Sequence, residues 1–282
     1  MRHVLLALPL LAACSSESPS QPDGGVVVLG CYVPPDGGIF VNGLPSPIPG
    51  CTTAPGPTGT LDFTTIGWPG FGVLFVPPTA APGTPLPAVF VFHGSGGTGE
   101  DIRERFGLEG PADGGAIFVY PDAVQQAAWY IRANSFDGSR LDTLLQKLTQ
   151  SYCVDPDRIY LAGFSAGAVF ALYMGCNVPR PFHGMAAVAG TDLRFAPSCC
   201  TGTMSAMFIH GTMDDTIPIS EGQHARNDTL GRDQCGSTPM PDDANCERYS
   251  CPAPLAVDYC EWAGDHDIPP FAADEVVRFF DL

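Results

Sequence analysis

Basic side chains are scarce in this chain. Its 282 residues include 13 Lys and Arg against 30 Asp and Glu, and the formal net charge is −17. The few basic residues are not clustered in any segment. Because binding to a nucleic-acid backbone needs a patch or stripe of positive charge, we expect no nucleic-acid partner. The excess of acidic residues is better explained by the solubility that net charge gives than by a binding function.

Motifs for metal and nucleotide binding are also missing. No Cys-x-x-Cys pair occurs, and no histidine lies at zinc-site spacing from the cysteines. The glycine-rich stretch His93–Gly97 is not followed by Gly-Lys-Ser/Thr, which excludes a phosphate-binding loop. No internal repeat is present. We therefore expect neither a metal ion nor an organic cofactor.

The N-terminal apolar run, Val4–Ala13, is too short to span a bilayer but suits the core of a signal peptide. It ends in Leu11-Ala12-Ala13-Cys14, which resembles a bacterial lipoprotein signal, where the cysteine becomes the lipidated N-terminus after cleavage. The alternative is an ordinary secretory signal cut near Ala13. Both readings predict export to the cell envelope or beyond, and the first predicts a membrane anchor on Cys14.

Composition divides the chain into three segments. Residues 1–13 are the predicted signal, and residues 14–30, rich in Ser, Pro, Gly, Gln and Asp, are a predicted flexible tether. Residues 31–282 are long enough for one large domain with its own core. Residues 31–60 are rich in Pro and Gly and hold two cysteines, so we expect them on the domain surface, pinned by disulfides.

Cysteine usage agrees with export. Setting Cys14 aside leaves ten of the 11 cysteines, and an even number in an exported chain argues for disulfides. Their pairing does not follow from the sequence, although the adjacent Cys199 and Cys200 are expected to reach different partners. The ten are Cys31, Cys51, Cys153, Cys176, Cys199, Cys200, Cys235, Cys246, Cys251 and Cys260.

Apolar runs of strand length alternate with helical patterns from about Leu61 onward. Leucines at 141, 144, 145 and 148 mark one face of a helix, and a turn is predicted at Asp155-Pro156-Asp157. This alternation predicts a mostly parallel sheet covered by helices on both faces, and the α/β-hydrolase fold fits it. The predicted strands are Phe71–Val76, Ala88–Phe92, Ala116–Tyr120, Arg158–Gly163, Met185–Ala189, Ala206–Ile209 and Ala256–Tyr259, and the closing helix is Ala272–Phe280.

The most informative motif is Gly163-Phe164-Ser165-Ala166-Gly167, a Gly-x-Ser-x-Gly pentapeptide. A strand pattern precedes it and a helix pattern, Ala166–Cys176, follows it. That context is typical of a sharp strand-to-helix turn that exposes a nucleophilic serine. The N–H of Ala166 would then lie at a helix N-terminus, where it can stabilise a developing oxyanion. A chance Gly/Ser turn is the alternative.

A serine hydroxyl needs a base, and the base needs an acid that orients it. In α/β-hydrolases the acid and then the histidine follow the serine in the chain. Asp214, just past a predicted strand, is the preferred acid; Asp215 and Asp192 are the alternatives. His266, between the last strand and the last helix, is the preferred base. The others fit less well: His3 is in the signal, His93 and His210 lie in His-Gly turns with packing or loop hydrogen-bonding roles, His183 precedes the acid, and His224 is expected on a helix.

The loop His93-Gly94-Ser95-Gly96-Gly97 follows a predicted central strand, where a second oxyanion donor is expected. Its glycines let the backbone approach a substrate closely. The backbone N–H of Ser95 is the candidate donor, with Gly96 as the alternative.

Taken together, these residues resemble the family of extracellular feruloyl esterases and polyhydroxybutyrate depolymerases, α/β-hydrolases of the carbohydrate-esterase type. The resemblance implies a triad of Ser165, Asp214 and His266, no cofactor, and an ester substrate that is a feruloyl or acetyl ester of polysaccharide or a hydroxyalkanoate polyester. One departure is Gly264-Asp265 before the histidine, where family members usually show Gly-Gly. The matching pieces span roughly Cys31 to the C-terminus: Phe90–Gly97, Tyr120–Asp122, Val154–Tyr160, Gly163–Gly167, His210–Asp214 with Ile217-Pro218, Cys246–Cys251 and His266–Pro269.

The sequence allows two interpretations for each of two tryptophans and one loop. Trp129 is either a stacking surface for an aromatic acyl group or a packing residue, and the same holds for Trp262 near His266. The loop 226–254, with three cysteines, is either a stapled lid beside the site or surface cover. Two other functions remain alternatives to a serine esterase: a serine peptidase on the same scaffold, and a non-catalytic lipoprotein that binds polysaccharide.

Overall fold

The computed structural model describes residues 44–54, 56–124, 129, 136–176, 182–192, 200, 202–242 and 245–282. The predicted signal and tether, His3, Cys14, Cys31 and Cys199 lie outside the described residues.

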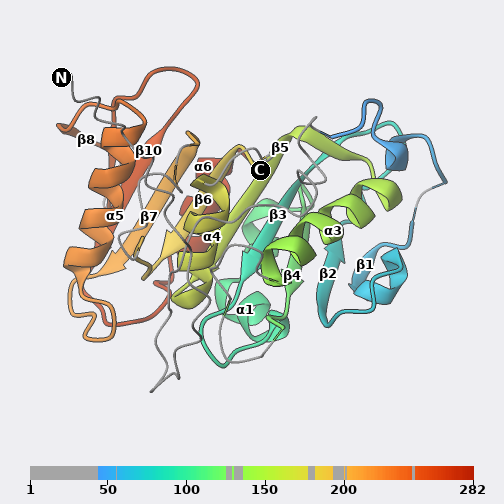
Figure 1. The fold of residues 1–282 in the computed structure, drawn as a ribbon, viewed down its shortest axis with the longest axis horizontal. Coiled ribbons are helices and arrows are strands. Elements are labelled where there is room, and N and C mark those ends of the chain that lie inside the picture. Colours follow the sequence, from blue (N-terminus) through green and yellow to red (C-terminus); the bar gives the residue numbers. More distant parts are fainter. Residues whose placement is uncertain are drawn as a thin grey trace, which may run out of the picture.

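A ten-stranded sheet forms the centre of the described structure, in the order β1-β2-β4-β3-β5-β6-β7-β10-β9-β8 (Figure 1). The strands from β4 to β10 in that order are parallel, and β1, β2, β9 and β8 extend the two edges in antiparallel fashion. The predicted fold class is therefore confirmed. The strands are β1 Gly59–Asp62, β2 Gly72–Val76, β3 Leu86–Phe92, β4 Ile117–Pro121, β5 Val154–Phe164, β6 Gly184–Val188, β7 Ser205–Gly211, β8 Pro239–Pro241, β9 Cys246–Tyr249 and β10 Val257–Trp262.

Helices cover both faces of the sheet because each face carries its own apolar cluster. One cluster joins the sheet to α3, α4 and α5, and the other joins it to α1, α2 and α6. The helices are α1 Gly99–Phe106, α2 Glu109–Ala112, α3 Phe136–Ser151, α4 Ala166–Cys176, α5 Ile219–Arg232 and α6 Ala272–Phe280; two short 3-10 turns, Pro49–Cys51 and Phe63–Ile66, precede them.

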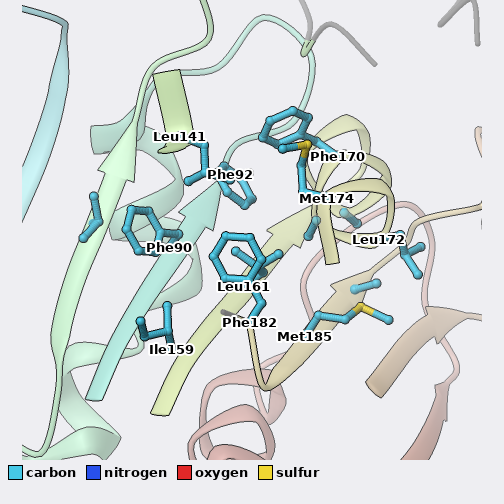
Figure 2. Close-up of a cluster of buried hydrophobic side chains, with 14 of the residues drawn as sticks. Phe90, Phe92, Leu141, Ile159, Leu161, Phe170, Leu172, Met174, Phe182 and Met185 are labelled. Atoms are coloured by element: carbon cyan, nitrogen blue, oxygen red, sulfur yellow. The ribbon is translucent and has the colours of Figure 1, made fainter. Parts of the chain in front are cut away.

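The helix that follows the serine is buried along its whole length. Every residue of α4 is buried, and Figure 2 shows side chains of α4 meeting those of β3 and β5 between helix and sheet. Phe92 and Phe170 pack edge to face with ring centroids 4.9 Å apart. Burying a phenylalanine of this kind contributes roughly 1.5–3 kcal/mol. The pentapeptide is thus followed by a helix that is buried along its whole length.

One local prediction needs correction. Asp155-Pro156-Asp157 is not a turn before the strand, because β5 already begins at Val154. These residues form an irregularity in its pairing with β3, where the register shifts between Leu86 and Ala88. Strands β8 and β9, within the cysteine-containing loop, were not predicted at all.

Four disulfides join eight of the cysteines in the described part: Cys51–Cys153, Cys176–Cys200, Cys235–Cys251 and Cys246–Cys260. The expectation of a disulfide framework is therefore met there. The Cys51–Cys153 bond ties the segment before β1 to the short link between α3 and β5. Closing a loop of 14 residues, as the Cys246–Cys260 bond does, contributes about 3 kcal/mol in the chain-entropy picture.

Candidate active site

Ser165 lies at a sharp turn between β5 and α4. Its φ is +54°, in the left-handed region that a residue with a side chain seldom adopts. A methyl group on Gly163 would lie 2.4 Å from the carbonyl of Gly167, and one on Gly167 would lie 2.1 Å from the carbonyl oxygen of Phe92. Both glycines are therefore required by close backbone approach, and together they hold the serine above the sheet edge.

The turn brings three distant side chains into one line. His266 Nε2 lies 2.8 Å from Ser165 Oγ, and His266 Nδ1 lies 2.7 Å from Asp214 Oδ2. Asp214 follows β7, and His266 lies in the segment between β10 and α6. Since β5, β7 and β10 are parallel, their carboxyl ends share one edge of the sheet, which is why the three side chains can meet.

The carboxylate of Asp214 is held on both oxygens. Its Oδ1 accepts the backbone N–H groups of Thr216 and Ile217 at 3.0 and 2.8 Å. Its Oδ2 faces His266 and also lies 3.3 Å from Nε2 of His210. Because a carbonyl can only accept, Nε2–H of His210 donates to the carbonyl of Ile217 at 2.8 Å. His210 therefore fixes the acid loop, in the hydrogen-bonding role expected from sequence.

The alternative acids lie elsewhere. Asp215 is exposed in the loop beside Asp214. Asp192 is buried near His224 and Asp228, and their ligand atoms lie within 4.8 Å of one another. This is the one His/Asp group in the described structure with such spacing, and it is separate from the pocket at Ser165. His224 lies on α5 as expected. The exposed His183 precedes β6 and so lies at the amino ends of the parallel strands, whereas Ser165 lies at their carboxyl ends.

His93 organises the glycine-rich loop. Its Nδ1–H donates to the carbonyl of Gly94 at 2.7 Å, and its Nε2 accepts the N–H of Ala123 at 3.1 Å. This pattern requires the neutral ring, and burial lowers the pKa of His93 against the opposing hydrogen bond to Gly94 and nearby acidic charges. The histidine thus has a structural role, as the sequence suggested.

The two oxyanion candidates flank the serine. Ser95 lines the same pocket as Ser165, and Ala166 begins α4. Within the described part of the chain, no protein acceptor takes a hydrogen bond from the backbone N–H of Ser95 or of Ala166. Both groups are thus available to a substrate oxygen. For Ala166 this is expected, because the first N–H groups of a helix have no partner within the helix.

A pocket of about 290 Å³ opens above the serine. Its charged side chains include Asp101 and Arg105 of α1, and Phe164 forms part of the wall. The guanidinium of Arg105 lies 4.6 Å from the centroid of the Phe164 ring, and its Nη2 donates to Asp267 Oδ1 at 2.6 Å. Sequence reasoning missed Arg105 and Asp267, because no motif relates two residues 162 positions apart.

The two tryptophans do not line this pocket. Trp129 is only 4% exposed; its ring packs on Phe92 and Phe170, and its Nε1–H donates to the carbonyl of His93 at 2.8 Å. It is a packing residue beneath the loop. Trp262 is half-buried at the end of β10, and its ring packs closely against Gly264.

The described residues of the segment 226–254 do not form a lid over the pocket. The segment continues α5 and then forms β8 and β9, the hairpin at the far edge of the sheet, where two disulfides fasten it. None of its described residues lines the pocket at Ser165. Of the two predictions for this segment, the structure favours surface cover.

Comparison with known proteins adds an independent line of evidence. The phospholipase/carboxylesterase family matches residues 133–244. The probable feruloyl esterase C of Aspergillus niger is 25% identical over 218 residues, covering 70% of this chain and 78% of the relative. Feruloyl esterase C of Emericella nidulans is 26% identical over 74% of this chain and 82% of its own length.

The chain is a carboxylic ester hydrolase related to the feruloyl esterases. The acetyl xylan esterase from Aspergillus awamori shares the fold of this esterase, with a TM-score of 0.60 and 15% identity over 79% of this chain and 99% of that one. The carboxylesterase of Bacillus cereus does so with a TM-score of 0.52 and 14% identity, over 70% and 88% of the two chains. Because the identities are this low, the two similar structures support the α/β-hydrolase fold and no finer conclusion.

The described part of this esterase also bears on its compartment. Its disulfides fit an extracellular protein, since such bonds persist in oxidising surroundings. Among the described residues, no helix combines the length and the apolar character that crossing a bilayer requires.

Proposed function

We propose that this esterase hydrolyses its substrates with a Ser165–His266–Asp214 triad. Ser165 Oγ attacks the ester carbonyl carbon while His266 Nε2 takes the hydroxyl proton, and the carbonyl oxygen becomes an oxyanion held by the N–H groups of Ser95 and Ala166. The C–O bond to the alcohol then breaks, and the alcohol leaves with the proton from His266. Water, deprotonated by His266, then attacks the acyl-serine. The C–O bond to Ser165 Oγ breaks, the acid is released, and His266 returns the proton to Oγ, which restores the free hydroxyl.

The observation that carries this proposal is the unbroken line from Asp214 through His266 to Ser165, with both contacts below 3 Å. Because Asp214 only accepts when ionised, Nδ1 of His266 carries the proton and Nε2 is left as the acceptor for the serine hydroxyl. This is the tautomer that a general base needs. The positive φ of Ser165 supports the same assignment, as do the N–H groups of Ser95 and Ala166, which donate to no acceptor among the described residues.

For the substrate we propose a feruloyl or acetyl ester carried by a polysaccharide. The feruloyl esterase relatives cover most of this chain, which supports an aromatic acyl group. The pocket is open to the surface and bounded on one side by Phe164, which suits an acyl chain attached to a large alcohol. The polyester substrate is the alternative that the test below distinguishes.

We further propose that the protein is exported and anchored through a lipid on Cys14. The apolar run Val4–Ala13, the small residues before Cys14 and the acceptor cysteine itself support this proposal. The disulfides support export. Metabolic labelling with a palmitate analogue in a bacterial host tests the anchor, and Cys14→Ala is expected to abolish the label.

The catalytic assignment is tested with Ser165→Ala on methyl ferulate, p-nitrophenyl acetate, acetylated xylan and polyhydroxybutyrate. We expect kcat to fall on the order of 10⁶-fold on every substrate that the wild type hydrolyses. Ser220→Ala, an exposed serine on α5, is the matched control and should leave kcat unchanged. A fluorophosphonate should label the wild type and the control but not Ser165→Ala. Wild-type activity in Ser165→Ala would refute the triad, and turnover of polyhydroxybutyrate alone would refute the proposed substrate.

A further inference from the structure

Arg105 touches two of the segments that build the candidate site. Its guanidinium lies over Phe164, the residue before the serine, and binds Asp267, the residue after the histidine. The ring of Phe164 in turn lies 5.1 Å from the ring of His266. Arg105 itself belongs to α1, the helix that follows the glycine-rich loop.

The helix that carries Arg105 is a firm support. Thr98 and Asp101 form a capping box at its start, and the N–H of Gly99 donates to Asp122 Oδ1 at 2.6 Å. A methyl group on Gly99 would lie 2.1 Å from the carbonyl oxygen of Tyr120, so the first turn of α1 rests directly on the end of β4. These contacts fix the position of the backbone of α1, and with it the point from which the Arg105 side chain extends.

The segment that carries His266 is also bound by the loop that follows β7. The N–H of Met213 donates to the carbonyl of Gly264 at 2.9 Å, and Asp214 holds the imidazole itself. Both contacts come from the loop after β7. Among the described residues, the Arg105–Asp267 ion pair is the one polar contact that joins this segment to α1.

We propose that Arg105 is a positioning residue for hydrolysis, which holds the His266 segment through Asp267 so that the imidazole keeps its place between Asp214 and Ser165. This inference rests on the proposed function. Arg105 and Asp267 are 48% and 54% exposed, so their ion pair contributes little to the stability of the fold. Its effect is on geometry, since a displacement of about 1 Å at a catalytic group can cost on the order of 10²-fold in rate.

Asp267 is suited to transmit this contact. Its Oδ1 accepts both the guanidinium of Arg105 and the N–H of Ile268, so one oxygen ties the side-chain contact to the backbone beside the histidine. Burial acts to raise the pKa of Asp267, but the hydrogen bonds from Ile268 and Arg105, with the charges of Arg105 and His266, lower it on balance. The carboxylate is accordingly ionised at neutral pH.

The test compares Arg105→Ala, Arg105→Lys, Asp267→Ala and the double variant Arg105→Ala/Asp267→Ala on p-nitrophenyl acetate. We expect Arg105→Ala to lower kcat about tenfold with KM within about twofold of the wild type. Arg105→Lys keeps the charge and should recover most of kcat. The double variant should lose no more than the larger single loss, because both changes break one contact.

Arg103→Ala is the matched control. Arg103 lies on the same helix and pairs with Glu100 and Glu109, on a face that does not line the pocket. It should lower the melting temperature without lowering kcat. If Arg105→Ala behaved in the same way, its role would be structural and the proposal would fail.

Two further results would overturn the proposal. A rise in KM with kcat intact would mean that Arg105 contacts the substrate. Losses that multiply in the double variant would mean that Arg105 does not act through Asp267. Ser165→Ala is run in the same assay: if it retained full activity, the proposed triad would fail whatever the Arg105 variants did.

Discussion

Gly167→Ala is expected to damage this esterase although it adds one methyl group to a helix. The new carbon would lie 2.1 Å from the carbonyl oxygen of Phe92 and 2.6 Å from that of His93. Ordinary contacts between heavy atoms begin near 3.5 Å, so the backbone of β3 and the start of α4 must separate by about 1 Å. Both groups are main chain and cannot move aside as a flexible side chain would.

Two magnitudes follow from this displacement. Overpacking of a filled interior costs roughly 1–3 kcal/mol of unfolding free energy. The same shift carries Ser165 and Ala166 away from the glycine-rich loop, and a misplacement of about 1 Å costs on the order of 10²-fold in kcat. The loss of activity should therefore be larger than any change in folding explains, and the protein should remain mostly folded at 25 °C.

The assay measures kcat on p-nitrophenyl acetate and unfolding by urea on the same preparations. Gly231→Ala is the control, because Gly231 lies in α5 and a methyl group there would meet nothing within 4 Å. Alanine favours the helix by up to about 1 kcal/mol relative to glycine, so this variant should be at least as stable as the wild type with the same kcat. If Gly167→Ala matched the wild type in both measurements, the close approach of α4 to β3 would be wrong.

Three other changes are expected to have separate effects. Asp214→Asn should lower kcat about 10⁴-fold with little loss of fold, since the imidazole loses the acceptor that fixes its tautomer; a loss below tenfold would contradict the triad. Burial lowers the pKa of His93 in the folded protein. As pH falls, this histidine is therefore protonated in the unfolded chain before it is protonated in the folded one. The free energy of unfolding should be unaffected by His93 above about pH 6.5 and should decrease below it. His93→Gln should flatten this pH dependence of the urea midpoint, and an unchanged slope would exclude His93 as its source. Replacing both Cys246 and Cys260 by alanine should lower the unfolding free energy by about 3 kcal/mol, and a normal urea midpoint would show that the edge hairpin is stable without the bond.

Much of the fold follows from the order of residues along the chain. The apolar runs before and after Ser165 set a buried strand and a buried helix, because side-chain periodicity is a property of near neighbours. The helix Ala166–Cys176 and the helix Ala272–Phe280 begin and end where the sequence predicts. Strand β8 gave no such signal: Pro239 and Pro241 disfavour a strand, and pairing with β9 at the sheet edge imposes the extended shape.

One part of the candidate site can likewise be predicted from the sequence, and the other part depends on the tertiary structure. The pentapeptide and its strand-to-helix context mark Ser165 without any structure, since the glycines that permit the turn are its neighbours in the chain. Asp214 and Asp215 are adjacent, and the sequence ranks them only by position. Tertiary structure separates them, because two backbone N–H groups and the imidazole of His266 surround Asp214, while Asp215 faces solvent.

The sequence by itself determined the alternating architecture, the turn at residue 165 and the small set of side chains from which an acid and a base could come. Only the tertiary structure decided which of them meet, that Trp129 belongs to the interior, and that Arg105 lies beside Asp267. The physical reason is that patterning and turns depend on residues a few positions apart. Hydrogen bonds and ion pairs depend instead on distances through space, which parallel strands set between segments more than a hundred residues apart.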